Sequence, residues 1–304
     1  MEIKILNRQE IDLLPDPVAL IEGMIFENTV VVVYGAPGSG KTFIALDMAL
    51  SIATKRSFIG KAVGGGQVLY MSGEGHAGIK KRIFSWEKHN EVKGNECFFL
   101  CPDALDFTNA DVVDQVAKQI KNTKITPKLI VVDTLAMYMH DADENSSMEM
   151  GAFLRGCEKL KKEFGSTILI VHHNGKVAGS SERGSSSLRG GADSMLEVKK
   201  DKTGKITLSC DKQKDAELEG AIYLQLNVVD NSCVITTYDC NSGSVDLKEA
   251  EKKCLLGLRE YTKRQDLIRF GFLTEGSASR ILPELIRKEL ICSPSRGEYC
   301  LTEK

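Results

Sequence analysis

The stretch Val30 to Thr42, which reads VVVVYGAPGSGKT, constrains the fold more than any other part of the chain. Val30 to Val33 are four consecutive β-branched residues, and a short apolar run of this kind is typical of a buried parallel strand. Two glycines and a proline within residues 35–38 then end the strand. From Gly40 onward, mostly apolar residues continue as a helix. The sequence therefore predicts a strand, a glycine-rich loop and a helix with no spare residues between them.

The loop in this context matches the phosphate-loop (Walker A) pattern Gly35-x-x-x-x-Gly40-Lys41-Thr42. Its glycines allow backbone N–H groups to surround a chain of phosphates, and the start of the helix adds partial positive charge. Lys41 is expected to reach the β and γ phosphates, and Thr42 to bind Mg²⁺. A glycine-rich turn that binds nothing is the alternative. The predicted cofactors are ATP and Mg²⁺, and the residues expected to bind the nucleotide are Gly35, Ala36, Pro37, Gly38, Ser39, Gly40, Lys41 and Thr42.

Composition limits the class of protein. The chain has 304 residues, of which 42% are hydrophobic and 27% charged, as is typical of a soluble globular protein with one large core and a small second domain. The net charge of -2 means that any nucleic-acid binding must come from local basic loops. No apolar stretch approaches the length of a membrane span, so we expect a cytoplasmic protein with no membrane partner. Nine scattered cysteines without a CxxC pair predict neither a zinc site nor a disulfide framework.

The region after the phosphate loop alternates between short apolar runs and helical patterns. Strands are predicted at 68–71, 97–100, 128–133 and 167–171, with helices between them that include 111–120 and 147–164. This alternation indicates an α/β fold, with a parallel sheet covered by helices on both faces. Beyond residue 192 the pattern changes to strands at 195–198, 206–210, 221–229 and 234–238, joined by turns. We expect these strands to form antiparallel hairpins that extend the sheet.

The domain boundaries follow from these changes in pattern. Residues 1–28 contain two prolines and are expected to form an N-terminal arm packed against the ATPase domain at 29–244. Residues 245–304 predict three short helices and a strand–turn–strand, which resemble a winged helix with 277–290 as the recognition helix. Pro283 is unfavourable inside that helix and predicts a shifted start. DNA binding and protein docking both remain open for this domain.

Two carboxylates are the candidates for the hydrolytic chemistry. Asp133 ends the run LIVVD, the Walker B pattern, and a buried strand would deliver it to the same sheet edge as the phosphate loop, where it can hold Mg²⁺. Glu74 lies at the tip of another predicted strand, between small residues. Hydrolysis needs a carboxylate that orients the attacking water and accepts its proton, and Glu74 is the best-placed candidate. A solvated loop glutamate is the alternative.

The next predicted strand ends in a histidine pair and a distinctive loop. His172 or His173 is positioned to sense the γ-phosphate, although a surface histidine pair is the alternative. Residues 174–191, NGKVAGSSERGSSSLRGG, are rich in Gly and Ser and cannot bury a core. The cations Lys176, Arg183 and Arg189 suit the backbone of single-stranded DNA, which is bound independently of its sequence. A flexible surface loop without a ligand is the alternative.

The order of GAPGSGKT, SGEG, LIVVD, HHNGK, RGSSSLRGGAD and CDKQKD, over about residues 15 to 240, resembles that of the RecA-like P-loop ATPases, an AAA-type RecA-fold group. The resemblance is closest to the RepA-type hexameric helicases of plasmids and phages. It implies that Glu74 is the catalytic glutamate, Asp133 the Walker B carboxylate and His173 or His172 the sensor. It also implies that 140–146 and 174–191 are the first and second DNA-binding loops.

Lys212 and Lys214 lie where RecA-like rings carry a Lys-x-Lys or Lys-x-Arg pair. The resemblance implies that this pair reaches the γ-phosphate of the neighbouring subunit, as an arginine finger does. Alternate strand residues point the same way, so both cations can face one site. This chain has lysine at the second position, which lacks the bidentate fork of arginine. Solvated strand lysines without a catalytic role are the alternative.

Together these features predict an ATP-hydrolysing DNA motor. The expected assembly is a homo-oligomer, a hexameric ring that translocates on single-stranded DNA as a replicative-type helicase, with other replication proteins as partners. A RecA-like recombination or annealing ATPase is one alternative, because the same head-to-tail interface gives a filament when the rotation does not close. An ATP-switched DNA-binding protein, such as a helicase loader or regulator, is the other.

Overall fold

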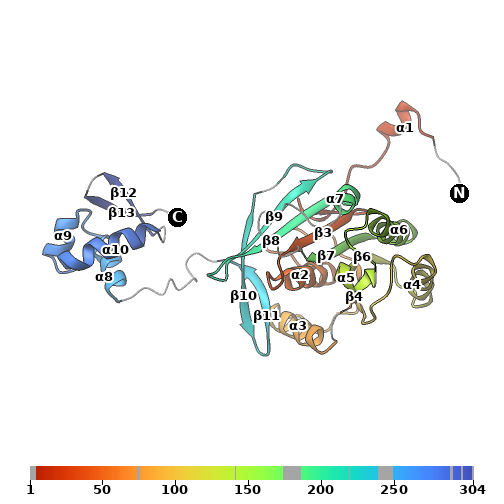
Figure 1. Cartoon of the computed structure of the whole chain (residues 1–304), viewed down its shortest axis with the longest axis horizontal. Coiled ribbons are helices and arrows are strands. Elements are labelled where there is room, and N and C mark those ends of the chain that lie inside the picture. The colour runs from red at the N-terminus through yellow and green to blue at the C-terminus, as the bar shows by residue number, and fades with distance from the viewer. Residues whose placement is uncertain are drawn as a thin grey trace. The chain divides into compact units, whose positions relative to one another are not determined.

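The structure, a computed structural model, describes residues 5–73, 76–140, 142–173, 186–218, 220–238, 249–287, 290–295 and 297–302. The chain divides into two compact units, Met1–Tyr238 and Asp239–Lys304. The first unit is built on a nine-stranded sheet, ordered β11-β10-β9-β8-β3-β7-β6-β4-β5 (Figure 1). Its strands are β3 (Val30–Gly35), β4 (Gln67–Ser72), β5 (Phe98–Cys101), β6 (Pro127–Asp133), β7 (Thr167–His173), β8 (Ser194–Lys200), β9 (Ile206–Gln213), β10 (Ile222–Val229) and β11 (Ser232–Thr237).

The strands from β8 to β5 in this order pair in parallel, and β9, β10 and β11 are joined to them by antiparallel pairing. The predicted α/β class is confirmed, and so is the antiparallel extension. Strand β8 itself belongs to both parts, because it lies parallel to β3 and antiparallel to β9. Parallel neighbours must be joined by crossover connections, which the intervening helices supply.

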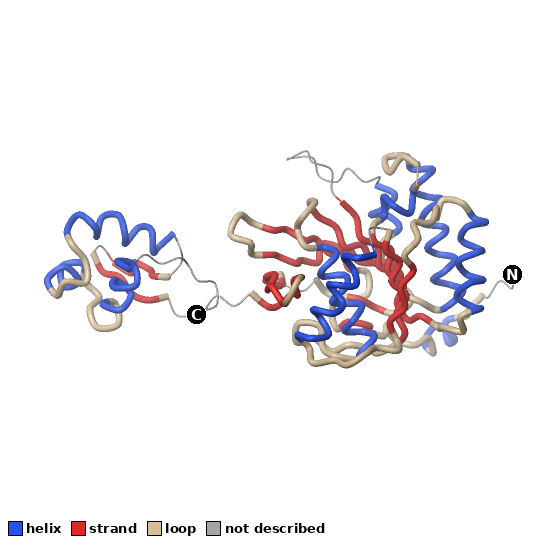
Figure 2. Tube along the Cα trace, turned by 90° about the horizontal axis from the view of Figure 1, so that it is seen from below, coloured by secondary structure: helices blue, strands red, loops and turns tan. Residues whose placement is uncertain are grey.

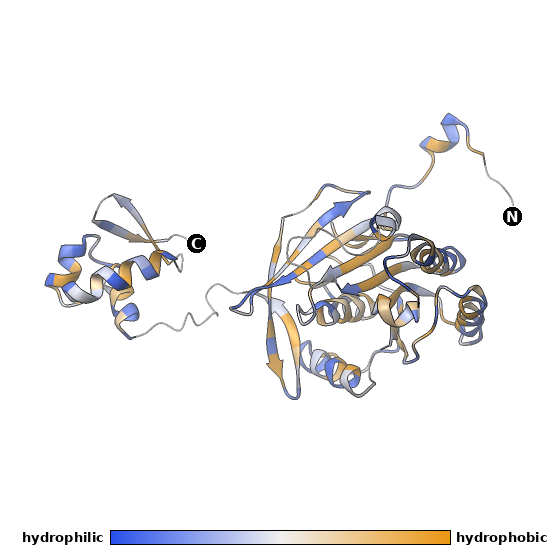
Figure 3. Cartoon of the chain, viewed as in Figure 1, coloured by the Kyte–Doolittle hydropathy of each residue, from blue (hydrophilic) through white to orange (hydrophobic). Residues whose placement is uncertain are grey.

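Helices cover both faces of the sheet (Figure 2). Helices α2 (Lys41–Thr54) and α3 (His76–His89) pack on one face, and α4 (Ala110–Asn122), α5 (Leu135–Met139), α6 (Ser147–Phe164) and α7 (Ser186–Gly191) on the other. Alternate strand residues enter the two cores: Val31 and Val33 contact the first, and Val30 and Val32 the second. The central strands are therefore buried on both faces, and their middle residues are hydrophobic (Figure 3).

The N-terminal segment differs from the expected packed arm. Strands β1 (Ala19–Ile21) and β2 (Ile25–Phe26) form a small antiparallel sheet that enters the first core. Helix α1 (Arg8–Asp12) is closed by a capping box between Asn7 and Glu10 but buries none of its residues. The side chains of Ile5 and Leu13 are 87% and 83% exposed. Packing against the sheet unit therefore begins only near residue 19.

The C-terminal unit has its own hydrophobic core. It contains α8 (Glu249–Gly257), α9 (Arg264–Arg269), α10 (Glu275–Arg287) and a hairpin of β12 (Ile291–Ser295) and β13 (Glu298–Leu301). These are the three helices and the strand–turn–strand that the sequence predicts. Pro283 lies inside α10, whose described start, Glu275, precedes the predicted start by two residues. No helix in the described part of the chain is long and apolar enough to cross a membrane.

Candidate nucleotide-binding site

The phosphate loop, Asp133 and the histidine pair lie at one edge of the sheet, where its parallel strands end. Gly35, the last residue of β3, is the register partner of His173 in β7 and of Val198 in β8. Asp133, the last residue of β6, is the partner of Ser72 at the end of β4. The carboxyl edge of an open α/β sheet is where such folds bind ligands.

The phosphate loop has a backbone that requires glycine. A Cβ atom on Gly35 would lie 2.1 Å from the carbonyl oxygen of Val198, so the loop can leave β3 only because that atom is absent. Gly40 has a φ of 102° and caps the N-terminus of α2, which begins at Lys41. The chain therefore turns directly from the strand into the helix, and the helix N-terminus opens at the loop, as anion binding demands.

The amine of Lys41 lies inside this loop. Its side chain is almost completely buried, with 3% exposed, and Nζ donates hydrogen bonds of 2.9 Å to the carbonyl oxygens of Gly35 and Ala36. A buried ammonium group held against the loop supplies the positive charge that a phosphate chain needs. Contact between Lys41 and the β and γ phosphates stays a prediction.

Asp133 joins the phosphate loop to its neighbouring strands. Its carboxylate is buried, and Oδ1 accepts a hydrogen bond of 3.3 Å from the Thr42 hydroxyl. Oδ2 accepts one of 2.6 Å from the hydroxyl of Tyr70, which comes from the middle of β4. Burial, followed by the charge of Asp133, raises the pKa of Tyr70 well above its ordinary value, so that Tyr70 remains a neutral donor. Sequence reasoning missed Tyr70, and the only available signal was a tyrosine in an otherwise aliphatic buried strand.

The chemistry of these donors fits Mg²⁺. A hydroxyl and a carboxylate oxygen are hard ligands, and Mg²⁺ is usually held by one or two such groups together with substrate phosphates and water. Among the described residues no group of three or more His, Cys, Asp or Glu side chains is placed to hold a metal ion. Thr42 and Asp133 would therefore hold the ion jointly with the nucleotide, whose bound Mg²⁺ neutralises phosphate charge.

The histidine pair ends strand β7, as the sequence predicts. His172 is 4% exposed, and burial, with the charges of His173 and Lys41, lowers its pKa to about 4. It is therefore neutral near pH 7. Its Nδ1 lies 3.8 Å from Oε2 of Glu144, which belongs to the predicted first DNA-binding loop. His173 is placed differently, because strand alternation puts it on the α2 face, beside Gly35.

Several predicted residues lie outside the described part of the chain: Glu74, Lys176 and Arg183. The strand end before Glu74 is described, and the amide of Gly73 donates a 2.9 Å hydrogen bond to the carbonyl of Asp133. A Cβ on Gly73 would lie 2.5 Å from Cβ of Met137, so a small residue is needed there. The chain leading to Glu74 thus passes directly beside Asp133.

Lys212 and Lys214 do not reach the phosphate loop of their own chain. Lys212 is the register partner of Met195, and its amine donates to the carbonyl oxygens of Arg189 and Ala192. The amine of Lys214 pairs with Asp193 at 2.7 Å. Asp193 also accepts from the backbone N–H of Val30, at the start of β3. The paired end of Lys214 therefore lies about five residues, or ~16 Å along the strand, from the loop that begins at Gly35.

Comparison with known proteins adds one finding. A family model described as AAA domain matches residues 6–179, which is more than half of the chain and includes the phosphate loop, Asp133 and both histidines. No curated protein shows significant sequence similarity to the chain.

Proposed function

The chain belongs to the AAA domain family of P-loop ATPases, and from this we propose that it is an oligomeric motor that uses ATP to move along single-stranded DNA and separate its strands. A replicative-type helicase of the RepA kind is the specific form of this proposal. The loop, Lys41 and the Thr42–Asp133 pair support nucleotide binding by their geometry. Glu74 would orient the attacking water, and His173 would sense the γ-phosphate beside Gly35.

The position of Lys214 supports an assembly of several copies of this chain. A cation that acts on the γ-phosphate must contact it, yet Lys214 is paired with Asp193 at the opposite edge of the sheet. Although burial acts to raise it, the hydrogen bonds from Lys214 and the Val30 N–H hold the pKa of Asp193 below its usual range. Lys214 has about half of its side chain exposed, so a second subunit has access to it. A trans-acting role in a head-to-tail ring fits this placement.

The direct test is ATP hydrolysis with and without single-stranded DNA, together with strand displacement on a forked duplex. A motor of this kind hydrolyses ATP faster on single strands and separates the fork. Stimulated hydrolysis without displacement, and filaments instead of rings in particle images, would favour the recombination or annealing ATPase. Slow hydrolysis indifferent to single strands would favour the ATP-switched binding protein, for which the helices and hairpin of the C-terminal unit are the supporting feature.

The shared site has a sharper test in mixed oligomers. Lys41→Ala and Lys214→Ala are each expected to abolish hydrolysis, the second while leaving nucleotide binding intact. When the two variants are mixed, some interfaces combine an intact Lys41 with an intact Lys214, and part of the activity should return. Lys88→Ala is the matched control, because Lys88 is another exposed lysine in an ion pair, with Asp230 at 2.8 Å. If the mixture stays inactive, or Lys214→Ala alone is fully active, the trans role of Lys214 is wrong.

A further inference from the structure

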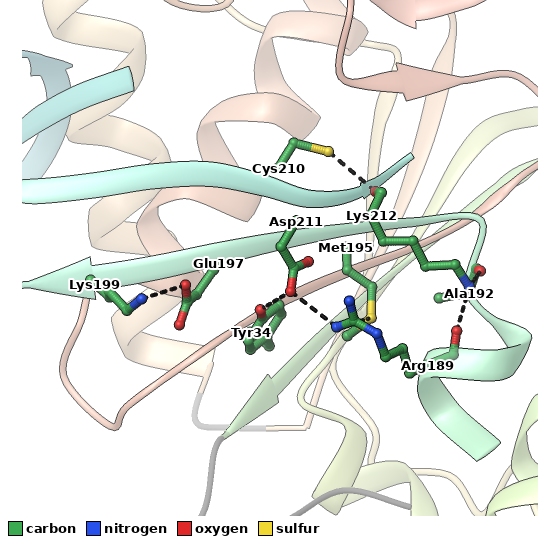
Figure 4. Close-up of polar contacts among 9 residues, drawn as sticks. All are labelled: Tyr34, Arg189, Ala192, Met195, Glu197, Lys199, Cys210, Asp211 and Lys212. Carbon is green, nitrogen blue, oxygen red and sulfur yellow. Dashed lines mark hydrogen bonds and ion pairs between the residues drawn. The ribbon is translucent and has the colours of Figure 1, made fainter. Parts of the chain in front are cut away.

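A β-bulge in strand β9 places one carboxylate where regular pairing would not. Met195 of β8 is the register partner of Lys212, and the next residue, Leu196, is the partner of Cys210. Asp211 is thus the extra residue between two pairs. Bulges turn a side chain away from the ordinary alternation. Here consecutive residues, Asp211 and Lys212, both reach the face of the sheet that carries α7 (Figure 4).

The carboxylate of Asp211 connects two other elements. Its Oδ2 accepts a hydrogen bond from the hydroxyl of Tyr34, the residue directly before Gly35 in β3. The same oxygen pairs with Nη1 of Arg189 at 3.0 Å. Burial, together with the hydrogen bond to Asp211 and its charge, raises the pKa of Tyr34, which therefore stays a neutral donor. One oxygen atom thus links α7 to the strand that delivers the phosphate loop.

Lys212 holds the same short helix by its backbone. Its amine donates to the carbonyl oxygen of Arg189 and, at 2.7 Å, to that of Ala192, at the C-terminal end of α7. A cation is favourable at a helix C-terminus because the last carbonyl groups have no partner within the helix. The two residues at the bulge therefore bind Arg189 twice: Asp211 pairs with its side chain, and Lys212 donates a hydrogen bond to its backbone carbonyl. Strand β9 then continues toward Lys214.

We propose that Asp211 is a positioning residue that couples DNA bound at Arg189 to the phosphate loop. This inference rests on the proposed motor function, in which Arg189 contacts the DNA backbone. Arg189 has about two fifths of its side chain exposed, so a phosphate and Asp211 compete for one guanidinium group. When a DNA phosphate binds Arg189 instead, the Asp211 carboxylate loses that ion pair and keeps its hydrogen bond from Tyr34. The strength of the Asp211–Tyr34 hydrogen bond, which lies directly beside Gly35, therefore changes.

The test variant is Asp211→Asn, which keeps the shape and removes the charge. Basal ATP hydrolysis should stay within about twofold of wild type, because Asp211 does not touch the nucleotide site. The stimulation by single-stranded DNA should fall about fivefold. The affinity for an oligothymidylate should rise about threefold, because the variant no longer competes for Arg189. Tighter binding with weaker stimulation is an outcome that general loss of structure does not produce.

Two further variants keep the test decisive. Tyr34→Phe removes the other bond of Asp211 but leaves its ion pair with Arg189, so stimulation should fall while DNA affinity stays unchanged. Glu27→Gln is the matched control: Glu27 is another carboxylate in an ion pair, with Lys128 at 3.0 Å, and neither quantity should change. If Asp211→Asn fails to fold, Tyr34→Phe decides the question alone.

The outcomes separate the inference from the function on which it rests. If wild-type hydrolysis is indifferent to single-stranded DNA, the proposed motor is wrong and the coupling falls with it. Single-stranded DNA could instead stimulate ATP hydrolysis of the wild type, Asp211→Asn and Tyr34→Phe to the same extent. In that case only the coupling through Asp211 is overturned. Loss of stimulation accompanied by proportionally weaker DNA binding would also overturn it, because that result describes damage to the DNA site.

Discussion

At the scale of single residues, the carboxylate of Asp133 accepts hydrogen bonds from two hydroxyl groups, and the expected roles of these two groups differ. Thr42 is a predicted Mg²⁺ ligand, whereas Tyr70 lies behind the carboxylate and orients it. Partners of this kind typically change metal affinity about 10-fold or more when removed. We therefore expect Tyr70→Phe to raise the Mg²⁺ concentration for half-maximal ATP hydrolysis about 10-fold. A Mg²⁺ titration of hydrolysis at saturating ATP measures this shift.

The matched control for this prediction is Tyr138→Phe. Tyr138 is equally buried, and its hydroxyl donates a 2.9 Å hydrogen bond to the backbone carbonyl of Asp103. Both variants should lose about 1 kcal/mol of unfolding free energy, since each removes one buried hydrogen bond. Only Tyr70→Phe should change the Mg²⁺ dependence. Equal titration curves for the two variants would show that Tyr70 has a structural role alone.

These residues also show how far sequence reasoning reaches. The positions of Gly35, Lys41 and Asp133 were predictable, because a local pattern and the rule that parallel strands end at one edge are sufficient. The bond from Tyr70 was not, since it depends on the register between β4 and β6. The bulge at Asp211 was not either, because it arises from pairing between strands and leaves no periodic signal. We expected the whole N-terminal arm to pack against the ATPase domain. This was wrong for residues 5–18, because most of their apolar side chains are exposed to solvent.

At the scale of elements, helix α2 is buried along most of its length, and this includes a carboxylate. Asp47 is 7% exposed and accepts a hydrogen bond of 3.2 Å from the Ser51 hydroxyl. Burial raises the pKa of Asp47 from 3.8 to about 6. The folded state thus holds a proton that the unfolded chain releases. Its contribution to the unfolding free energy is fully present below pH 3.8 and is lost as the pH rises through about 6.

Asp47→Asn should remove this pH dependence from α2. Relative to wild type, its unfolding free energy should increase by up to about 3 kcal/mol between pH ~4 and pH ~7, because the wild type must ionise a buried group over that interval. Urea unfolding across this pH range provides the measurement. Ser51→Ala keeps the titrating carboxyl group and should retain the wild-type slope. A difference between Asp47→Asn and wild type that does not vary with pH would contradict the prediction.

At the scale of the whole molecule, the two units have separate hydrophobic cores. The cores of the sheet unit draw on described residues no later than Ile235, whereas the C-terminal core begins at Cys254. A fragment that ends at Tyr238 therefore keeps every residue of its own cores and of the nucleotide site. We expect it to unfold within about 2 °C of the corresponding transition of the full chain.

Calorimetry and hydrolysis assays on this fragment complete the prediction. The full chain should show two transitions, because two cores need not unfold as one cooperative unit. The fragment should retain basal ATP hydrolysis, since the phosphate loop, Asp133 and Lys214 all lie before residue 238. Loss of duplex DNA binding without loss of strand displacement would assign DNA contact to the C-terminal helices, whereas unchanged DNA binding would favour protein docking. A fragment that fails to fold would show that the sheet unit depends on residues after Tyr238.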